Sequence, residues 1–526
     1  MTRHSQGAST GNIGPWWRGG VIYQVYPRSF ADGNGDGIGD LDGLVARLDH
    51  ISGLGVDAIW LNPIHPSGGV DGGYDVMDYT SVDPDYGDLE TFDLLLRAVH
   101  ERGMKVLMDF VPHHTSDRHP WFIESRSSKD SAKRDWYVWA DRRDGGRPNN
   151  WLSAFRDSPW EWDERTGQFY LASFYAGQPD LNWHDPEVRE AIGGAMRFWV
   201  DRGVDGFRLD VVHRLGKDRL LRDNPPDSRG EWERAGGLAG QPAYDQDRPE
   251  THHAVRGIRK AVGRTSLLLG EVWLLSLPHV RSYLGPDELD LAFNFPFARS
   301  RWDAPAISSM VEQTEAIFST GDDWPCYHLS NHDMPRLATQ HGPEAVRPAA
   351  MLLLTLRGTT VLYQGEEIGM ADGDVPPERR RDLVGRDGCR TPMQWDDSAH
   401  AGFCPPSVEP WLPVADASGG TNVAAQEGDP DSILALYRRL LALRRRSPAL
   451  RAGRYRQVGS SSTAFLYLRE QGEERMLVAL SFGSIPIEVP AWPGTVEVGT
   501  SVAREGERVG RTCLLEPAEG LVIRLD

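Results

Sequence analysis

The sequence predicts an α/β protein: a (β/α)8 TIM barrel with an inserted subdomain after its third strand and a C-terminal antiparallel β-domain. Short apolar, β-rich segments alternate with amphipathic segments over most of the chain, eight such segments are present, and acidic residues recur directly after them. Eight parallel strands with helical crossovers close into a barrel whose strand ends meet at one face. A doubly wound open sheet is the alternative, but it gathers its functional residues at one switch point.

Eight runs rich in Val, Ile, Leu and Phe are the candidate barrel strands. They are Val21–Val25, Ala58–Leu61, Val106–Phe110, Gly206–Leu209, Leu267–Leu269, Leu291–Phe295, Tyr327–Leu329 and Thr360–Tyr363. The stretches between them include LDGLVARLDHISGLG, TFDLLLRAVHERG and AIGGAMRFWVDRG. Each of these stretches has helical periodicity and ends in Gly, as helices often do.

The alternation breaks off twice. Residues 115–185 lack it and are rich in Trp, Asp, Arg and Ser, which predicts an inserted subdomain B. Near the end of the chain, TAFLYLRE, RMLVALSF and GLVIRLD alternate apolar and polar residues, as antiparallel strands do. We therefore expect a first barrel part (1–114), the subdomain (115–185), the rest of the barrel (186–450) and a C-terminal β-sandwich domain (451–526).

Composition limits the partners. A chain of 526 residues with 40% hydrophobic content can bury a large core, and a net charge of −19 disfavours nucleic acid and anionic membranes. The first 20 residues contain no apolar stretch typical of a signal peptide, and no run of 18 apolar residues occurs. The four cysteines are scattered, as in a reduced compartment. We expect a cytoplasmic protein, a monomer or homodimer, without a membrane or nucleic-acid partner.

Four short motifs lie at predicted strand ends: DFVPHH (Asp109–His114), GFRLD (Gly206–Asp210), GEVW (Gly270–Trp273) and LSNHD (Leu329–Asp333). Each places a carboxylate at the C-terminal mouth of a strand, where barrel enzymes build their sites. One such Asp would be explained as a helix N-cap. Four of them, each beside Arg, His, Asn or Trp, predict a catalytic site.

These motifs, in this order, resemble the signature regions of the α-amylase superfamily of glycoside hydrolases, family 13. The resemblance covers nearly the whole chain and includes GVDAIWLNPI and GTTVLYQGEEIGM on two further strands. QPDLNW and RTPMQW resemble the oligo-1,6-glucosidase and α-glucosidase branch. The implied substrate is a small oligosaccharide or glucoside.

The resemblance implies three catalytic carboxylates. Asp210 matches the nucleophile that forms a covalent glycosyl-enzyme, Glu271 the general acid/base, and Asp333 the third carboxylate, which binds sugar hydroxyls. A retaining mechanism needs two carboxyls about 5–5.5 Å apart, one ionised and one protonated. Arg208 precedes Asp210 by two strand positions, so it points to the same side and favours the ionised form. The apolar neighbour Trp273 favours a protonated Glu271.

Further residues match the subsite that binds the terminal glucose. His114 and His332 match histidines that hydrogen-bond this sugar. Asp71 and Tyr74, in DGGYD, match the closed end of the pocket, and Arg390 matches the arginine that pairs with that Asp. Arg386 is the alternative partner. Such a closed end implies an exo-acting enzyme that removes one terminal glucose.

The preferred linkage stays open. Val211, directly after the nucleophile, resembles branch members that cleave α-1,6 bonds, where Thr accompanies α-1,4 cleavage. Trp273 also resembles a residue of the +1 subsite of α-1,6-acting members. The segment VHRLGKDRLLRDNPPD resembles bacterial α-glucosidases of mixed or α-1,4 preference instead.

The segment DGNGDGIGDL resembles a calcium loop. Its candidate ligands for a structural Ca²⁺ are Asp32, Asn34, Asp36, the carbonyl of Ile38, and Asp40. Carboxylates this close repel each other without a cation. A second calcium beside the subdomain is not expected, because His113 replaces the Asn that binds it in many relatives; we expect His113 to brace a loop.

The expected function is an exo-acting retaining α-glucosidase that releases non-reducing terminal glucose from short α-glucosides, linked α-1,4 or α-1,6 or both. An α-glucosyl transferase or a sucrose- or trehalose-type isomerase, working through the same intermediate, is the alternative. A catalytically inactive binding protein of barrel shape is disfavoured, because the carboxylate triad is present and no membrane helix is evident.

Overall fold

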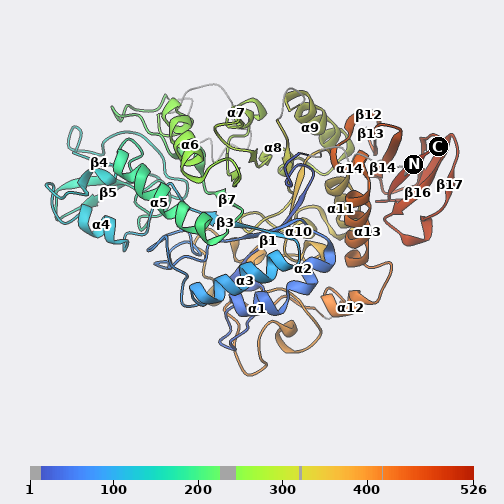
Figure 1. Ribbon diagram of the computed structural model, residues 1–526, viewed down its shortest axis with the longest axis horizontal. Helices are drawn as coiled ribbons and strands as arrows, with labels where there is room; N and C mark the ends of the chain where they lie inside the picture. Colours follow the sequence, from blue (N-terminus) through green and yellow to red (C-terminus); the bar gives the residue numbers. More distant parts are fainter. Residues whose placement is uncertain (1–13, 226–243, 319–322, 418) are drawn as a thin grey trace, which may run out of the picture.

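Eight parallel strands form the centre of the molecule in the computed structural model, which describes residues 14–225, 244–318, 323–417 and 419–526 (Figure 1). The strands pair in the order β10-β11-β1-β2-β3-β7-β8-β9, and a bridge between Phe293 and Cys326 joins the two outer strands. The predicted barrel is therefore confirmed. Its strands are β1 (Val21–Val25), β2 (Ala58–Leu61), β3 (Lys105–Phe110), β7 (Gly206–Leu209), β8 (Leu267–Gly270), β9 (Leu291–Ala292), β10 (Cys326–Tyr327) and β11 (Thr359–Tyr363).

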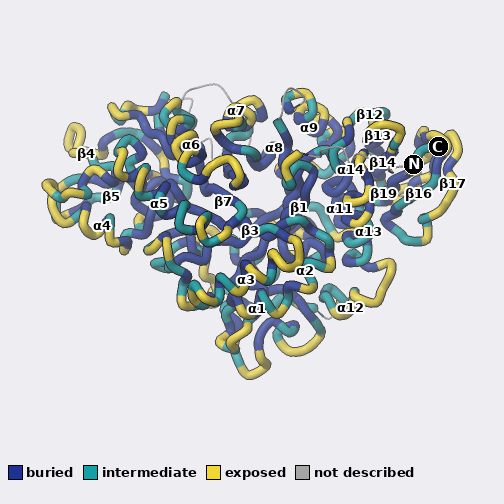
Figure 2. Tube along the Cα trace, viewed as in Figure 1, coloured by how far each residue is buried: buried dark blue, intermediate teal, exposed yellow. Residues whose placement is uncertain are grey.

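Two barrel strands are shorter than the apolar runs that predict them. β9 ends at Ala292, because the Asn294 side chain accepts a hydrogen bond from the Phe297 amide and starts a helix. β10 ends at Tyr327, and the chain continues through His328 toward the catalytic motif. Side chains that fill the barrel, such as Trp60 and Leu269, form one core cluster. Figure 2 shows the buried strands at the centre of the molecule.

Helices follow the barrel strands, and local sequence sets their ends. Asp88 and Asp185 accept hydrogen bonds from backbone amides at the starts of α3 and α5, as N-caps do. α5 ends at Arg202, and Gly203 caps it with a φ of 109°, which a residue with a side chain rarely adopts. The helices are α1 (Leu41–Ala46), α2 (Leu48–Leu54), α3 (Leu89–Glu101), α4 (Pro120–Ser125), α5 (Pro186–Arg202), α6 (Pro249–Val262), α7 (Leu277–Ser282), α8 (Phe295–Ala298), α9 (Ala304–Ile317), α10 (Leu337–His341), α11 (Val346–Thr355), α12 (Val423–Glu427), α13 (Ile433–Arg446) and α14 (Pro448–Ala452).

A small sheet interrupts the barrel between β3 and α5. It has the antiparallel order β4-β6-β5, formed by β4 (Trp139–Ala140), β5 (Trp160–Asp163) and β6 (Gln168–Leu171). Its own core includes the stacked rings of Trp151 and Trp160. In Figure 1 this subdomain lies on the side of the barrel opposite the C-terminal sheets.

The chain after α14 folds into antiparallel sheets. A six-stranded sheet of order β12-β13-β14-β19-β16-β17 accompanies the pair β15-β18, and one apolar cluster contains residues of both. These sheets are attached to the barrel by Arg469, which donates to the carbonyl of Thr355 at the end of α11. The strands are β12 (Arg454–Ser460), β13 (Ala464–Gln471), β14 (Glu474–Ser481), β15 (Ile487–Pro490), β16 (Gly494–Gly499), β17 (Arg508–Val509), β18 (Thr512–Leu515) and β19 (Gly520–Leu525).

Within the described part of the chain, no helix combines the length and the apolar character that crossing a bilayer requires.

Candidate active site

Asp210 and Glu271 lie next to each other because their strands are paired. β7 and β8 are parallel with Leu209 opposite Gly270, and the two carboxylates are the next residues of each strand. Arg208 joins them: Nη1 donates to Asp210 Oδ1 at 2.8 Å, and Nη2 donates to Glu271 Oε2 at 2.5 Å. One guanidinium fork therefore holds both carboxyls of the predicted catalytic pair.

The charge balance of this pair follows from its surroundings. Burial raises the pKa of the Asp210 carboxyl well above its usual value, the positive charge of Arg208 opposes the shift, and the nearby Glu271 carboxylate adds to it. The Arg208 charge thus favours the ionised form of Asp210, which is the form that a nucleophile needs.

Asp109 extends the same network. It lies opposite Arg208 in the pairing of β3 and β7, and Arg208 Nη1 donates to its Oδ1 at 3.0 Å. Its Oδ2 accepts from Trp60 Nε1 at 3.2 Å and from the Tyr74 hydroxyl at 3.0 Å. Burial raises the pKa of Asp109 to about 6, although Arg208 opposes this. Asp109 is part of a motif in the sequence, but nothing in the sequence indicates that it contacts Arg208. That contact depends on the register between β3 and β7, which the sequence does not reveal.

Asp333 lies where two arginines converge. Arg386 Nη1 and Arg390 Nη2 each donate to Asp333 Oδ1 at 2.9 Å, and His332 Nε2 is 3.0 Å from Oδ2. Burial by itself would raise the pKa of Asp333, but the neighbouring His332, Arg386 and Arg390 hold it well below its usual range. Asp333 is therefore ionised in the folded protein.

The closed end of the pocket differs from the prediction in one partner. Asp71, in the loop after β2, pairs with Arg386, whose Nη2 lies 2.6 Å from Oδ1. Arg390, predicted as this partner, instead donates to the His332 carbonyl at 2.8 Å and to Asp333. The assignment of Arg390 to Asp71 is thus wrong, and the alternative, Arg386, makes the contact. Both arginines lie in one 3-10 helix, Arg386–Arg390. Because a 3-10 helix has three residues per turn, side chains four positions apart do not point in the same direction.

Two histidines complete the predicted subsite. Gln24 Nε2 lies 2.8 Å from His332 Nδ1 and donates to it, so the ring proton is on Nε2, which lies 2.6 Å from the Tyr74 hydroxyl. The rings of His332 and Tyr74 are stacked at 5.5 Å. His114 Nε2 is 3.1 Å from Gln178 Nε2, which also donates to Asp71 at 3.1 Å. Gln178 is thus a further pocket residue; the sequence had indicated it only as part of QPDLNW.

His113 braces a loop through a buried ion pair. Its Nε2 lies 3.2 Å from Asp180 Oδ2 and 3.0 Å from Lys217 Nζ, which itself lies 3.3 Å from Asp180. The Lys217 ammonium supplies the positive charge between the third barrel strand and the subdomain. Local sequence gave no signal for Lys217, because it follows His113 by 104 positions and meets it only in the folded barrel.

Val211 and Trp273 follow the two catalytic carboxylates. Val211 has a φ of 36°, a left-handed conformation that is strained for a β-branched residue. In this conformation the Val211 amide donates a hydrogen bond to Glu271 Oε2 at 3.3 Å. The half-buried Trp273 ring lies 4.1 Å from the Phe295 ring, so the residue two positions after Glu271 makes an aromatic contact.

The predicted metal loop turns tightly around its own carboxylates. Asp32 accepts hydrogen bonds from the amides of Gly35 and Gly37 at 2.6 and 2.8 Å, and Asp40 accepts from the Gly43 amide at 2.6 Å as the N-cap of α1. Among the described residues, no cluster of three or more Asp, Glu, His or Cys side chains forms a metal site. The hard oxygen donors fit Ca²⁺ in kind, and burial together with the charge of Asp32 raises the pKa of Asp40.

Comparison with known proteins places this geometry in a family. Residues 24–453 match the model of the alpha-amylase catalytic domain. The chain belongs to the alpha-amylase family. It is a glycoside hydrolase of family 13, as the match over most of its length and the names of its relatives show. A probable alpha-glucosidase of Rhizobium meliloti is 43% identical over 88% of each chain, and an oligo-1,6-glucosidase of Parageobacillus thermoglucosidasius is 36% identical over 89% of this chain and 90% of its own.

Solved structures of this family superimpose over nearly the whole chain. The alpha-glucosyl transfer enzyme XgtA has a TM-score of 0.89 at 39% identity, covering 98% of this chain and 100% of its own. The trehalulose synthase MutB of Pseudomonas mesoacidophila MX-45 has a TM-score of 0.90 at 34% identity, covering 98% and 100%. Hydrolases and glucosyl transfer enzymes thus share this architecture.

Proposed function

We propose that this family member is an exo-acting retaining α-glucosidase that releases the non-reducing terminal glucose of short α-1,4- or α-1,6-linked glucosides. The observation that carries the proposal is a set of connected side chains, in which Arg208 holds Asp210 and Glu271 and Arg386 joins Asp71 to Asp333. The names of the relatives from Rhizobium meliloti and Parageobacillus thermoglucosidasius support the same class of substrate.

The chemistry follows from the three carboxylates. Asp210 attacks the anomeric carbon while Glu271 gives its proton to the departing glycosidic oxygen, which leaves a glucosyl ester on Asp210. Glu271 then removes a proton from water, and that water cleaves the ester with overall retention. Arg208 stabilises the carboxylates during both steps, and Asp333 binds hydroxyls of the distorted sugar.

The exo mode follows from the closed end. Asp71 and Arg386 lie side by side, only 8% and 14% of their side chains are exposed, and Gln178 ties Asp71 to His114. A polymer that extends past the terminal glucose would have to break a buried ion pair, which costs about 3–5 kcal/mol. The pocket therefore selects chain ends.

Substitution of the nucleophile tests the proposal. Asp210→Asn should lower hydrolysis of maltose and isomaltose at least about 10³-fold while leaving the melting temperature near that of the parent. Mass spectrometry of the parent, quenched with a slow fluoro-glucosyl substrate, should show one glucosyl adduct on the peptide that contains Asp210. The matched control is Asp201→Asn, at the exposed end of α5. Near-normal turnover by Asp210→Asn would overturn the proposal.

Glucosyl transfer is the second candidate, and one feature favours it. The half-buried Trp273 ring, two residues after Glu271, packs against the Phe295 ring at 4.1 Å. An aromatic face there holds a sugar acceptor in place of water. The ratio of transfer products to free glucose at high maltose concentration separates the two activities. A ratio that stays near zero would exclude transfer.

Two further properties belong to the proposal. We infer that the loop from Asp32 to Asp40 binds a structural Ca²⁺ through the oxygen donors of Asp32, Asn34, Asp36, Ile38 and Asp40, away from the catalytic pocket. We also infer a cytoplasmic location, which the four buried, unpaired cysteines support.

A further inference from the structure

Four buried side chains beside Asp333 form a closed ring of hydrogen bonds. Gln24 Nε2 lies 2.7 Å from Asn62 Oδ1 and 2.8 Å from His332 Nδ1. Asn62 Nδ2 and His332 Nε2 in turn lie 3.0 and 2.6 Å from the Tyr74 hydroxyl. Tyr74 is the most exposed of the four, at 5%, so these polar groups depend on each other for their hydrogen bonds.

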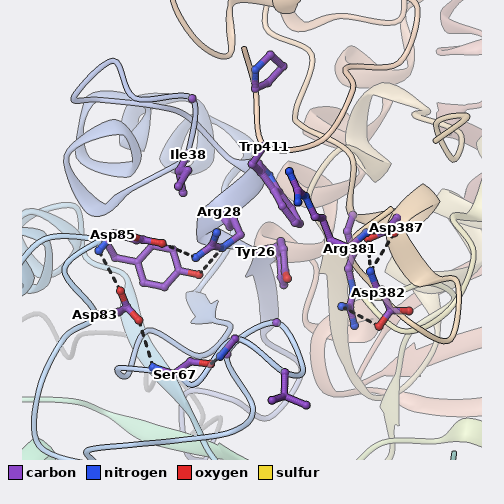
Figure 3. A pocket seen from close by; sticks show the side chains of 18 of the residues that line it. Tyr26, Arg28, Ile38, Ser67, Asp83, Asp85, Arg381, Asp382, Asp387 and Trp411 are labelled. Atoms are coloured by element: carbon purple, nitrogen blue, oxygen red, sulfur yellow. Dashed lines mark hydrogen bonds and ion pairs between the residues drawn. The ribbon is translucent and has the colours of Figure 1, made fainter. Parts of the chain in front are cut away.

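His332 is enclosed by aromatic rings and is neutral. Its imidazole stacks on the rings of Tyr74 and Tyr26, whose centroids lie 5.5 and 6.2 Å away. Tyr26 also lies at the wall of a cavity of about 910 Å³, but no member of the hydrogen-bonded ring lines this cavity (Figure 3). Burial lowers the pKa of His332 well below its usual value, although Asp333 opposes the shift. The imidazole therefore carries one proton, and its neighbours decide which nitrogen holds it.

The Tyr74 hydroxyl decides the direction of the ring, because it has three partners within 3.0 Å and only one proton of its own. The third partner is Asp109, whose Oδ2 lies 3.0 Å away. If both partners within the ring donate to the hydroxyl oxygen, Tyr74 is free to donate its own proton to Asp109. All three contacts are then hydrogen bonds. Gln24 Oε1 is left as the one polar atom of the ring without a partner among the described residues.

The opposite direction leaves acceptors facing each other. With the amides of Gln24 and Asn62 turned over, three acceptors would compete for the single proton of Tyr74. An unprotonated His332 Nε2 would also face Asp333 Oδ2, 3.0 Å away, on a carboxylate that is ionised. Buried acceptors without a donor are strongly disfavoured. The Gln24 amide therefore donates to both of its neighbours, and the proton of His332 is on Nε2.

We propose that Gln24 and Asn62 are positioning residues that make His332 a hydrogen-bond donor toward the bound sugar. Asn62 anchors the Gln24 amide, and this amide occupies the lone pair of His332 Nδ1, so Nε2 keeps the proton. The ionised Asp333 can only accept, and its Oδ2 lies 3.0 Å from Nε2. One hydroxyl can therefore accept from His332 and donate to Asp333 at the same time. The proton position rests on the contacts alone, and the sugar as the source of that hydroxyl rests on the proposed function.

Nitrogen NMR of the full-length enzyme, labelled with nitrogen-15 histidine and without substrate, measures the position of the proton. His332→Asn identifies the two ring signals of His332 by their loss. In the parent, Nε2 should be the protonated nitrogen, and Nδ1 should be unprotonated and hydrogen-bonded. A parent spectrum with the proton on Nδ1 would overturn the proposal.

A matched pair of variants assigns the effect to Gln24. Gln24→Met keeps the length of the side chain but offers no donor, so the Nδ1 signal should shift toward that of a nitrogen without a hydrogen bond. The control is Gln364→Met, because Gln364 is a buried amide after the neighbouring strand that contacts the Tyr26 amide at 2.8 Å and the Ser29 carbonyl at 3.2 Å. It should leave both His332 signals in place. Identical signals in the parent and Gln24→Met would overturn the proposal, and if Gln24→Met does not fold, the parent spectrum alone decides.

Kinetics link the proton to the reaction. Gln24→Met should lower kcat for maltose at least about tenfold, and more than Gln364→Met does at a similar loss of melting temperature. Equal losses of kcat in these two variants would show a structural role only and would overturn the proposal. Asn62→Leu frees the Gln24 amide, so it should shift the Nδ1 signal in the same direction; an unchanged signal would remove Asn62 from the role. A parent without activity on any α-glucoside would count against the proposed function, whereas the NMR result would still decide the proton position.

Discussion

The guanidinium of Arg386 lies 2.6 Å from the carboxylate of Asp71, although 315 positions of sequence separate them. The same guanidinium donates to Asp333 and to Asp382, so one side chain joins the closed end of the pocket to the third catalytic carboxylate. In the proposed function, the residues that recognise a chain end and the carboxylate that binds the distorted sugar therefore share one guanidinium.

Arg386→Lys should lower kcat/KM for maltose about 100-fold or more, because an ammonium cannot reproduce the guanidinium fork across several carboxylates. The loss should appear in kcat as well as in KM, since Asp333 loses one of its donors. Steady-state kinetics with maltose measures both. Arg381→Lys, on an exposed residue of the same loop, is the control. A variant that keeps the parent kcat/KM would show that the pair is dispensable.

Glu271→Gln should separate the two halves of the reaction. Without a proton donor, glucosides with poor leaving groups should lose about 10³-fold or more in rate, while those with strongly acidic leaving groups lose much less. Azide, which needs no base to attack, should restore turnover and give α-glucosyl azide, identifiable by NMR, because it displaces the β-linked glucosyl ester on Asp210. An equal loss for every leaving group, without azide rescue, would remove Glu271 from this role.

His328 should make the fold sensitive to acid. Burial lowers its pKa to about 3, and its ring lies between Phe293 and Phe295, 5.1 Å from each. In the unfolded chain a histidine binds its proton near pH 6.5. Stability is therefore lost as the pH falls from about 6.5 toward 3, because the unfolded state binds more protons there.

Between pH 7 and pH 5 this one histidine should cost about 2 kcal/mol of unfolding free energy. His328→Phe should reduce the difference in stability between the two pH values by that amount in urea titrations. His253→Phe, on an exposed position of α6, should leave the difference unchanged. Identical pH dependence of His328→Phe and the parent would contradict the pKa direction.

Ca²⁺ should stabilise the fold without changing the chemistry. A ligand at 100 times its dissociation constant adds about 2.7 kcal/mol to the stability of the state that binds it. Chelator should lower the melting temperature of the parent, added Ca²⁺ should restore it, and Asp36→Asn should abolish the response. Asp42→Asn, on an exposed residue of α1, should retain it. Melting that chelator leaves unchanged would exclude the metal.

Lys217→Met should destabilise the protein by about 3–5 kcal/mol, because it leaves the buried Asp180 carboxylate with one charged neighbour fewer. His113 and Lys217 hold the pKa of Asp180 far below its usual range against the effect of burial, so this carboxylate stays ionised. Urea unfolding measures the loss. Lys217→Arg should recover part of it, and a Met variant as stable as the parent would show that the ion pair contributes nothing.

The sequence predicts the barrel well because parallel strands buried on both faces read as continuous apolar runs. It also predicts Asp210, Glu271 and Asp333, since each directly follows or closely follows such a run. The end of β9 is not predicted, because the local cap at Asn294 starts a helix within an apolar run.

Contacts between distant loops are harder to predict from the sequence. Arg386 and Arg390 both precede RTPMQW closely or lie within it, and only the turn of their 3-10 helix decides which one reaches Asp71. Lys217 carries no local signal at all, since its partners His113 and Asp180 come from other segments. Pairings of this kind depend on how the barrel closes.

The distance in sequence between Asp71 and Arg386 also orders events during synthesis. During synthesis, Asp71 leaves the ribosome long before Arg386 does. Because β11 pairs with β1, the barrel closes only after β11 has been made, and Arg386 can contact Asp71 only then. A nascent chain that has completed only its first seven barrel strands has no closed barrel, and it also lacks the contact between Asp71 and Arg386. Glucosides can therefore act as a folding ligand only for the finished chain, and a product truncated before Arg386 gains no protection from its own substrate.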